Sequence, residues 1–251
     1  MADAMLQVEQ VTKRFGGLLA VDRASFSAEV GRVTALIGPN GAGKTTLFSI
    51  ISGFQALSEG HIRYLGADIT GEPPHRLARR GIARTFQIVQ PFAGLTVREN
   101  IAIGAHLHCA SRPKALAAAT TVANAVDLGE FLERPASTLT VAGRKRLELA
   151  RALAIEPRLL LLDEVLAGLN PSEVRGMVPV IQSIAKRGVT IVMIEHIMQA
   201  VMSLADHVYV LAEGRIIAQG EPQEIASNPR VIEAYLGHGA AARMIGEAKR
   251  D

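Results

Sequence analysis

Several features are scarce in this chain, and each absence narrows its function. Among 251 residues there is one cysteine, Cys109, so no internal disulfide can form and a reducing, cytoplasmic setting is expected. No apolar run reaches the length of about 18 residues typical of a membrane-spanning helix, so the chain is not expected to cross a bilayer itself. The N-terminal stretch MADAMLQVEQ lacks the apolar segment of a signal peptide.

Positive charge is also limited. Lys and Arg number 27 against 24 Asp and Glu, and basic residues form only short clusters such as Arg79–Arg80 and Arg144–Arg146. A nucleic-acid binder more often carries a continuous basic stripe, so no nucleic-acid partner is expected. Apolar residues at 49% and charged residues at 20% are typical of a globular protein. The length predicts one domain, or one domain with a subdomain.

Short apolar runs alternate with helical patterns along most of the chain. Buried strands are expected at Val33–Ile37, Leu159–Leu162 and Val189–Ile194, because each is a strand-length apolar run bounded by Gly, Pro or charged residues. A helix is expected after Gly43, with an apolar face that includes Leu47. Strands separated by helices in this way predict an α/β fold with a mainly parallel sheet.

Other segments predict antiparallel strands and a helical insert. The antiparallel strands are expected at Leu6–Val11, Ala20–Ala28, Gly60–Tyr64, Val208–Leu211 and Arg215–Gln219. The last two flank a Glu-Gly pair that is typical of a hairpin turn. Residues 92–153 are rich in alanine and show no strand-like run, so we expect a helical subdomain inserted between core segments 1–91 and 154–251. The last residues, 239–251, are expected to fray.

The clearest functional motif is a glycine-rich loop between a predicted strand and a predicted helix. It matches G-x-x-x-x-G-K-[ST] in full and comprises Gly38, Pro39, Asn40, Gly41, Ala42, Gly43, Lys44 and Thr45, followed by Thr46. Glycines let the backbone curl so that successive N–H groups face one anion, and the helix N-terminus adds partial positive charge. Lys44 is expected to reach the β- and γ-phosphates of ATP, and the Thr45 hydroxyl to bind Mg²⁺.

Two carboxylates stand at the end of the predicted strand Leu159–Leu162. Ligands of open α/β sheets bind at the carboxyl ends of the strands, so both side chains are expected to lie near the phosphate loop. Asp163 would hold Mg²⁺, directly or through water, and Glu164 would polarise the attacking water. The alternative, an exposed acidic strand end, is common, but the upstream loop favours the functional interpretation.

The strand Val189–Ile194 also ends in polar residues. His196 follows Glu195 there, where contact with a γ-phosphate is geometrically reasonable, although a lone histidine is more often structural. The other six histidines, which include His106 and His108, belong to no ligand cluster and are expected at the surface.

In this order, these motifs resemble the ATP-binding subunits of ABC transporters over nearly the whole chain. The resemblance implies a P-loop NTPase, or RecA-like, core with an N-terminal antiparallel β subdomain and an inserted α-helical subdomain. Phe15 would stack on adenine, unless it is a core residue, and Gln87 would contact Mg²⁺ and sense the membrane partner. His196 would contact the γ-phosphate. The loop Ala167–Pro171 would cross to a second subunit, with Asn170 where many members have Asp.

Finer features resemble one branch of that family, which serves importers of branched-chain and other hydrophobic amino acids. The segments that carry this likeness are Arg84–Gln87, Gly168–Pro171, Arg146–Arg151 and Ala234–Gly237. The alternatives are an ATPase of another transporter (lipopolysaccharide export, or urea or amide uptake), a soluble ABC ATPase, and a nucleotide-binding scaffold without turnover. Soluble members usually carry two cassettes in one chain or a long coiled-coil insert, and neither pattern occurs in this sequence.

The stretch TLTVAGRKRLELARAL, Thr138–Leu153, resembles the family's signature loop, usually written LSGGQ, although most letters differ. Thr140 keeps the usual hydroxyl, and Gly143 and the helix start keep backbone N–H donors for the γ-phosphate of ATP on the opposite subunit. Arg144, where Gln is usual, either adds positive charge near the phosphates or lies on a solvated helix face. Val165 is a second departure, where Pro usually follows the Glu. Because all catalytic residues are intact, we expect a working variant.

The resemblance also implies partners. Two copies, or one copy and a related subunit, would bind head to tail with ATP and Mg²⁺ sandwiched between them. Membrane-spanning permease subunits would bind directly, and a periplasmic substrate-binding protein indirectly, with this chain peripheral at the cytoplasmic face of the inner membrane. The apolar cluster after Gln87 is expected either to line a groove for a short permease helix or to be core. It comprises Ile88, Val89, Pro91, Phe92 and Leu95.

Overall fold

The computed structural model describes residues 4–87 and 90–236, and this part of the chain contains two β-sheets. The strands are β1 Ala4–Phe15, β2 Leu18–Glu29, β3 Val33–Ile37, β4 Glu59–Tyr64, β5 Ala67–Asp68, β6 Ile82–Arg84, β7 Leu159–Asp163, β8 Thr190–Ile194, β9 His207–Ala212 and β10 Arg215–Gly220. One sheet is antiparallel with the order β2-β1-β4-β5. The other has the order β10-β9-β3-β8-β7-β6, parallel except for the β9–β10 hairpin.

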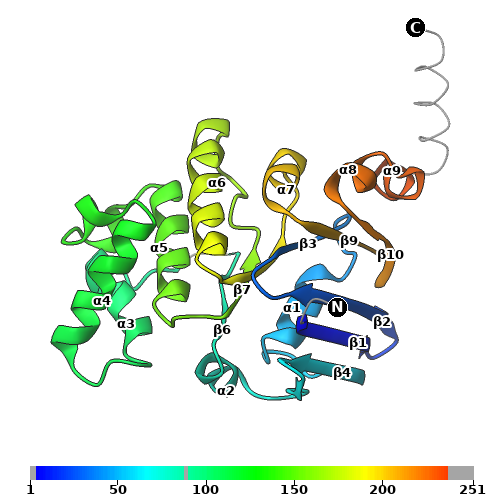
Figure 1. The fold of residues 1–251 in the computed structure, drawn as a ribbon, viewed down its shortest axis with the longest axis horizontal. Coiled ribbons are helices and arrows are strands. Elements are labelled where there is room, and N and C mark those ends of the chain that lie inside the picture. Colours follow the sequence, from blue (N-terminus) through cyan, green and yellow to red (C-terminus); the bar gives the residue numbers. More distant parts are fainter. Residues whose placement is uncertain (1–3, 88–89, 237–251) are drawn as a thin grey trace, which may run out of the picture.

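Helices cover the sheets and form a separate group at one end of the molecule (Figure 1). They are α1 Lys44–Ile51, α2 Pro74–Arg79, α3 Val97–Ala105, α4 Arg112–Ala125, α5 Val141–Leu153, α6 Pro171–Lys186, α7 Met198–Leu204, α8 Pro222–Ala226 and α9 Pro229–Leu236, with short 3-10 turns at Gly129–Phe131 and Ala136–Thr138. The green helices α3, α4 and α5 lie together, away from β1 and β2. No described helix is long and apolar enough to cross a membrane.

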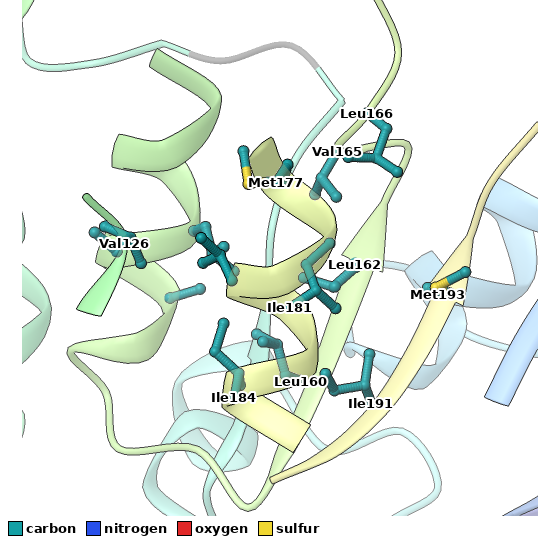
Figure 2. Close-up of a cluster of buried hydrophobic side chains, with 14 of the residues drawn as sticks. Val126, Leu160, Leu162, Val165, Leu166, Met177, Ile181, Ile184, Ile191 and Met193 are labelled. Carbon is teal, nitrogen blue, oxygen red and sulfur yellow. The ribbon is translucent and has the colours of Figure 1, made fainter. Parts of the chain in front are cut away.

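One apolar cluster joins α6 to the parallel sheet. Figure 2 shows Ile181 of α6 beside Leu162 of β7, and Met177 and Ile184 are buried on the same helix. This helical spacing brings them against Leu160 and Ile191, and all these side chains are buried. Burial of each such side chain stabilises the fold by about 1.5–3 kcal/mol. The packing therefore fixes the two strands whose carboxyl ends carry the candidate catalytic residues.

A second apolar cluster holds the phosphate-loop helix. Leu47, Phe48 and Ile51 of α1 are buried together with Leu6 of β1 and Leu36 of β3. The helix is thus packed between the antiparallel sheet and the parallel one, which sets the direction in which its N-terminus points.

The strands predicted from sequence are confirmed, with ends that differ by a few residues. The sequence prediction omitted β5 and β6, because Ala67–Asp68 has only two residues and Ile82–Arg84 is short and ends in an arginine. Four of the six further histidines are exposed as expected; they are His61, His75, His106 and His108. The surface assignment is wrong for His207, which is half-buried with its ring 4.8 Å from that of Tyr209. His238 and the segment 239–251 lie outside the described residues.

Candidate nucleotide-binding site

The glycine-rich loop joins β3 to α1, and two of its glycines are required by geometry. Gly38 has φ 150° and Gly43 has φ 101°, backbone conformations that residues with a side chain rarely adopt. A Cβ on Gly38 would collide with the carbonyl oxygen of Leu211, and one on Gly43 with that of Ala20. The loop thus lies against β9 and β2, which leaves its inner side free for a phosphate.

Lys44 is buried and bends back over the loop. Its Nζ donates to the carbonyl oxygens of Gly38 and Pro39, at 2.7 and 2.9 Å. Burial lowers the pKa of this ammonium, while the nearby carboxylates of Glu164 and Asp163 oppose the shift. The side chain therefore lies across the loop, close to two carboxylates.

Asp163 ends β7 and is almost fully buried. Its Oδ2 accepts a 2.8 Å hydrogen bond from Nη2 of Arg84, and its backbone N–H donates to the Thr85 hydroxyl. Within the described part of the chain, the buried Oδ1 has no hydrogen-bond partner. Thr45 lines the same 450 Å³ cleft as Asp163. A free carboxylate oxygen and a hydroxyl in one cleft fit Mg²⁺, which prefers oxygen ligands.

Glu164 is held at both carboxylate oxygens. Oε1 lies 2.5 Å from Nε2 of His196, and Oε2 accepts a 2.7 Å hydrogen bond from Nε2 of Gln87. The residue has φ 49°, and its backbone N–H donates to the carbonyl oxygen of Ile194 in β8. This left-handed conformation turns the side chain away from Asp163. The two carboxylates thereby serve different positions, as expected from the sequence.

The loop, the carboxylate and the histidine share one cleft of 580 Å³. Its lining brings together most of the predicted residues: Phe15, Asn40, Gly41, Ala42, Gly43, Lys44, Thr45, Thr46, Gln87, Glu164 and His196. Phe15 is 42% exposed, so the alternative of a core phenylalanine is wrong. Its exposed ring lies at the end of β1, with Nζ of Lys13 at 4.8 Å from the centroid. An exposed ring beside a phosphate loop suits a planar base.

The signature residues lie elsewhere, at the N-terminus of α5, and line neither of these clefts. Thr140 is the N-cap, and its hydroxyl accepts a 3.2 Å hydrogen bond from the N–H of Gly143. The N–H groups of Val141 and Ala142 have no partner within the described chain. The expected Gly143 donor is thus engaged in the helix cap, and the two preceding N–H groups are left as unpaired donors in its place.

Arg144 is exposed, but its guanidinium bends back onto the turn before α5. Its Nε donates to the carbonyl oxygen of Leu139 at 3.0 Å, and its Nη2 to that of Ser137 at 3.1 Å. The guanidinium therefore braces the turn before α5. Asn170 of the crossing loop has a comparable local role: it caps α6 through the N–H groups of Ser172 and Glu173.

Sequence reasoning did not assign roles to two buried charged residues of the site. Nζ of Lys145, on α5, donates to the carbonyl oxygens of Glu164 and Gln87, at 3.0 and 3.3 Å. Glu195 accepts from the N–H of Leu166, and burial raises the pKa of its carboxyl to about 7. In the sequence Lys145 stands between two arginines and Glu195 follows an apolar strand, and neither setting reveals the partner of the charge.

Known proteins resemble this chain over nearly its full length. Residues 21–167 match the family described as ABC transporter, and residues 215–241 match the family described as branched-chain amino acid ATP-binding cassette transporter. The high-affinity branched-chain amino acid transport ATP-binding protein BraF of Pseudomonas aeruginosa is 41% identical, covering 94% of this chain and 99% of that protein. LivG of Escherichia coli, of the same description, is 37% identical with the same coverage.

Solved structures of ATP-binding cassettes are also similar to this chain. A nucleotide-free ATP-binding cassette from an ABC transporter has a TM-score of 0.86 and 32% identity, covering 94% of this chain and all of that one. An ADP-bound cassette has a TM-score of 0.85 and 33% identity, covering 94% of this chain and 99% of that chain. The predicted P-loop NTPase fold is thereby confirmed. This chain belongs to the ABC transporter family and is one of its ATP-hydrolysing cassettes.

Proposed function

We propose that this chain drives an importer for branched-chain or other hydrophobic amino acids. The observation that carries the catalytic part is Glu164, held between His196 and Gln87 in the cleft of the phosphate loop. The substrate class is supported by the curated relatives, which are named as branched-chain amino acid transport subunits. These relatives favour a transport function over the alternatives of a soluble ABC ATPase or a nucleotide-binding scaffold without turnover.

ATP would bind in the cleft with its parts at separate positions. The exposed Phe15 ring would stack on adenine. The N–H groups of the loop and of the first turn of α1 would surround the β-phosphate, where the helix dipole also favours negative charge. Lys44 would leave the carbonyl oxygens of Gly38 and Pro39 to pair with phosphate oxygens, a charge-assisted exchange.

Mg²⁺ would be held by the Thr45 hydroxyl, by the amide oxygen of Gln87 and by Asp163, directly or through water. When bound, this ion neutralises charge that develops on the phosphate oxygens. Within the protein, Asp163 contributes its free Oδ1, and Thr45 contributes a hydroxyl from the first turn of α1. The Gln87 side chain now donates to Glu164, so it would have to turn its amide oxygen toward the ion.

Hydrolysis needs an acceptor for the proton of the attacking water. Glu164 would polarise that water, because its carboxylate points into the cleft from the end of β7. His196 would orient the carboxylate and contact the γ-phosphate, as a bridge between the two groups. Both residues line the cleft that contains Lys44, so no large rearrangement of the core is required.

The site of one subunit would be completed by a second subunit. Thr140, Gly143 and the unpaired N–H groups of Val141 and Ala142 would face the γ-phosphate of ATP bound to the partner in a head-to-tail dimer. We keep, within this proposal, the division into a core of 1–91 and 154–251 and a helical subdomain of 92–153, to which α3, α4 and α5 belong.

Binding to permease subunits would place the chain at the cytoplasmic face of the cell membrane, with a substrate-binding protein acting from the other side.

The proposed transport function is tested by uptake of labelled leucine in cells from which the gene for this chain has been deleted. The parent chain should restore uptake, whereas Glu164→Gln should not, with uptake through an unrelated transporter as the control. Restored ATP turnover without restored uptake of any branched-chain amino acid would contradict the substrate class.

A further inference from the structure

A buried arginine joins the metal-binding carboxylate to the phosphate-loop helix. Arg84 ends β6, at the edge of the parallel sheet, and its side chain is only 7% exposed. The Asp163 side chain, its partner in a 2.8 Å ion pair, is 2% exposed. An arginine cannot lose its proton to escape burial, and an ionised carboxylate without a partner is costly in such surroundings. Each of the two charges therefore depends on the other for its stability in the buried site.

The same guanidinium also contacts the last turn of α1. Its Nη1 donates to the hydroxyls of Ser49 and Ser52, at 3.1 and 2.9 Å. The Ser49 hydroxyl donates in turn to the carbonyl oxygen of Thr45, at 2.8 Å. One arginine thus reaches the Asp163 side chain directly and the Thr45 backbone through one hydroxyl. These are two of the residues proposed above to hold Mg²⁺.

The position of the charge suits the helix it contacts. The last turn of α1 contains no basic residue of its own, and a helix C-terminus favours a cation nearby. The rings of Phe86, Phe54 and Phe48 surround the guanidinium, with their centroids 5.4, 5.9 and 6.0 Å from its central carbon. Such contacts stabilise a cation that water does not reach. Arg84 is therefore fixed in place by the Asp163 carboxylate, by the end of α1 and by the aromatic rings.

We propose that Arg84 is a positioning residue for the metal site. It occupies Oδ2 of Asp163 and leaves Oδ1 free to face Thr45, so that both ligands are oriented before nucleotide binds. This inference rests on the proposed metal-binding roles of Asp163 and Thr45. Loss of Arg84 would free the carboxylate to rotate and would leave its charge without compensation.

The first test is a double-mutant cycle of thermal unfolding without nucleotide or Mg²⁺. Arg84→Met keeps the length of the side chain and removes its charge. We expect it to lower the melting temperature of the parent by on the order of 10 °C. In the Asp163→Asn background, the same change should be neutral or stabilising, since it removes an arginine that has lost its carboxylate. Equal losses in both backgrounds would show that Arg84 only fills space.

The second test measures ATP binding with and without Mg²⁺. Arg84→Met should weaken binding of Mg·ATP roughly tenfold and change binding of metal-free ATP by less than about threefold. Arg84→Lys, which keeps the charge but not the planar fork, should recover stability better than Mg·ATP affinity. Tighter Mg·ATP binding by Arg84→Met would mean that the arginine competes with the ion, and would overturn the proposal. Neither readout depends on hydrolysis, so failure of the Glu164 assignment would be seen separately.

Discussion

Nε2 of His196 lies 2.5 Å from Oε1 of Glu164, although the two residues end different strands of the parallel sheet. The contact exists because β7 and β8 are neighbours and end at the same edge. Gln87 holds the other carboxylate oxygen from the end of β6. The proposed catalytic carboxylate is thus oriented by residues that follow both neighbouring strands, β6 and β8.

The first prediction concerns this carboxylate. Glu164→Gln preserves size and polarity but cannot accept a proton from water. We expect ATP binding to persist and turnover to fall by two orders of magnitude or more, a barrier increase of about 2.7 kcal/mol. The variant should accumulate as an ATP-bound dimer. Phosphate release by the purified protein measures the first effect, and size-exclusion chromatography the second.

The matched control is Glu130→Gln, which removes an exposed carboxylate from the helical part of the chain. It should hydrolyse ATP like the parent. Near-normal hydrolysis by Glu164→Gln would show that this residue does not accept the proton of the attacking water.

The sequence predicted, for physical reasons, most of the residues that gather in this cleft. A phosphate loop needs particular glycines, because a Cβ at Gly38 or Gly43 would meet backbone atoms of neighbouring strands. The strand that ends at Asp163 and the strand that ends two residues before His196 are fully buried and mainly apolar, so they are easily recognised. The glycine requirement of the loop and the apolar pattern of the strands therefore both indicated the same edge of the sheet.

The contacts that orient these groups were not predictable in the same way. The sequence contains three charged residues whose hydrogen-bond partners lie far away along the chain: Arg84, Lys145 and Glu195. No rule of sequence spacing connects these residues to their partners. The Gly143 N–H was expected to face phosphate, but the structure uses it in the helix cap of Thr140. A hydrogen bond within a turn competes with a ligand, and the sequence does not show which prevails.

The second prediction concerns the surface proposed to bind a permease subunit. Of the apolar cluster after Gln87, Ile88 and Val89 lie outside the described residues. Phe92 is 48% exposed, so the alternative of a core position is wrong for it. The ring lies 5.0 Å from the guanidinium carbon of Arg151. Phe92→Asp should weaken co-purification with membrane subunits and leave hydrolysis by the isolated chain unchanged.

The comparison variant is Val30→Asp, because Val30 is 47% exposed and lies in the turn between β2 and β3. It adds the same charge at a site with no proposed partner and should co-purify like the parent. If Phe92→Asp abolishes both folding and hydrolysis, its ring supports the fold and not a partner.

The third prediction concerns pH. Burial, with a smaller effect of Glu164, raises the pKa of Glu195 from 4.5 to about 7. The folded chain therefore holds this proton more tightly than the unfolded chain. Stability from this group is fully present below about pH 4.5 and declines as pH rises to about 7, by up to about 3 kcal/mol.

Glu195→Gln should flatten that decline, since an amide does not titrate and its oxygen can still accept from the N–H of Leu166. Urea unfolding of both proteins between about pH 5 and about pH 8 measures the difference. Parallel curves for parent and variant would show that Glu195 is ionised throughout this range.

The last prediction concerns the signature region at the start of α5. The unpaired N–H groups of Val141 and Ala142, the two residues directly before Gly143, form the donor surface proposed for the partner's γ-phosphate. A Cβ at Gly143 would lie 3.2 Å from Cβ of Leu139, a tight contact that a small shift can relieve. An acidic residue in the first turn also favours the helix, so Gly143→Asp should fold. Its effect should come from charge repulsion at the subunit interface.

Gly143→Asp should leave ATP affinity of the monomer within about threefold, under 1 kcal/mol, because the cleft is built from other residues such as Phe15 and Lys44. It should remove the rise in specific activity with protein concentration that a sandwich dimer produces. Gly143→Ala adds the same Cβ without charge and should keep that rise, which separates crowding from repulsion. ATP binding and turnover measured across protein concentrations decide the matter. If Gly143→Asp hydrolyses ATP like the parent, the start of α5 does not face nucleotide across the dimer, and the head-to-tail mechanism is wrong for this chain.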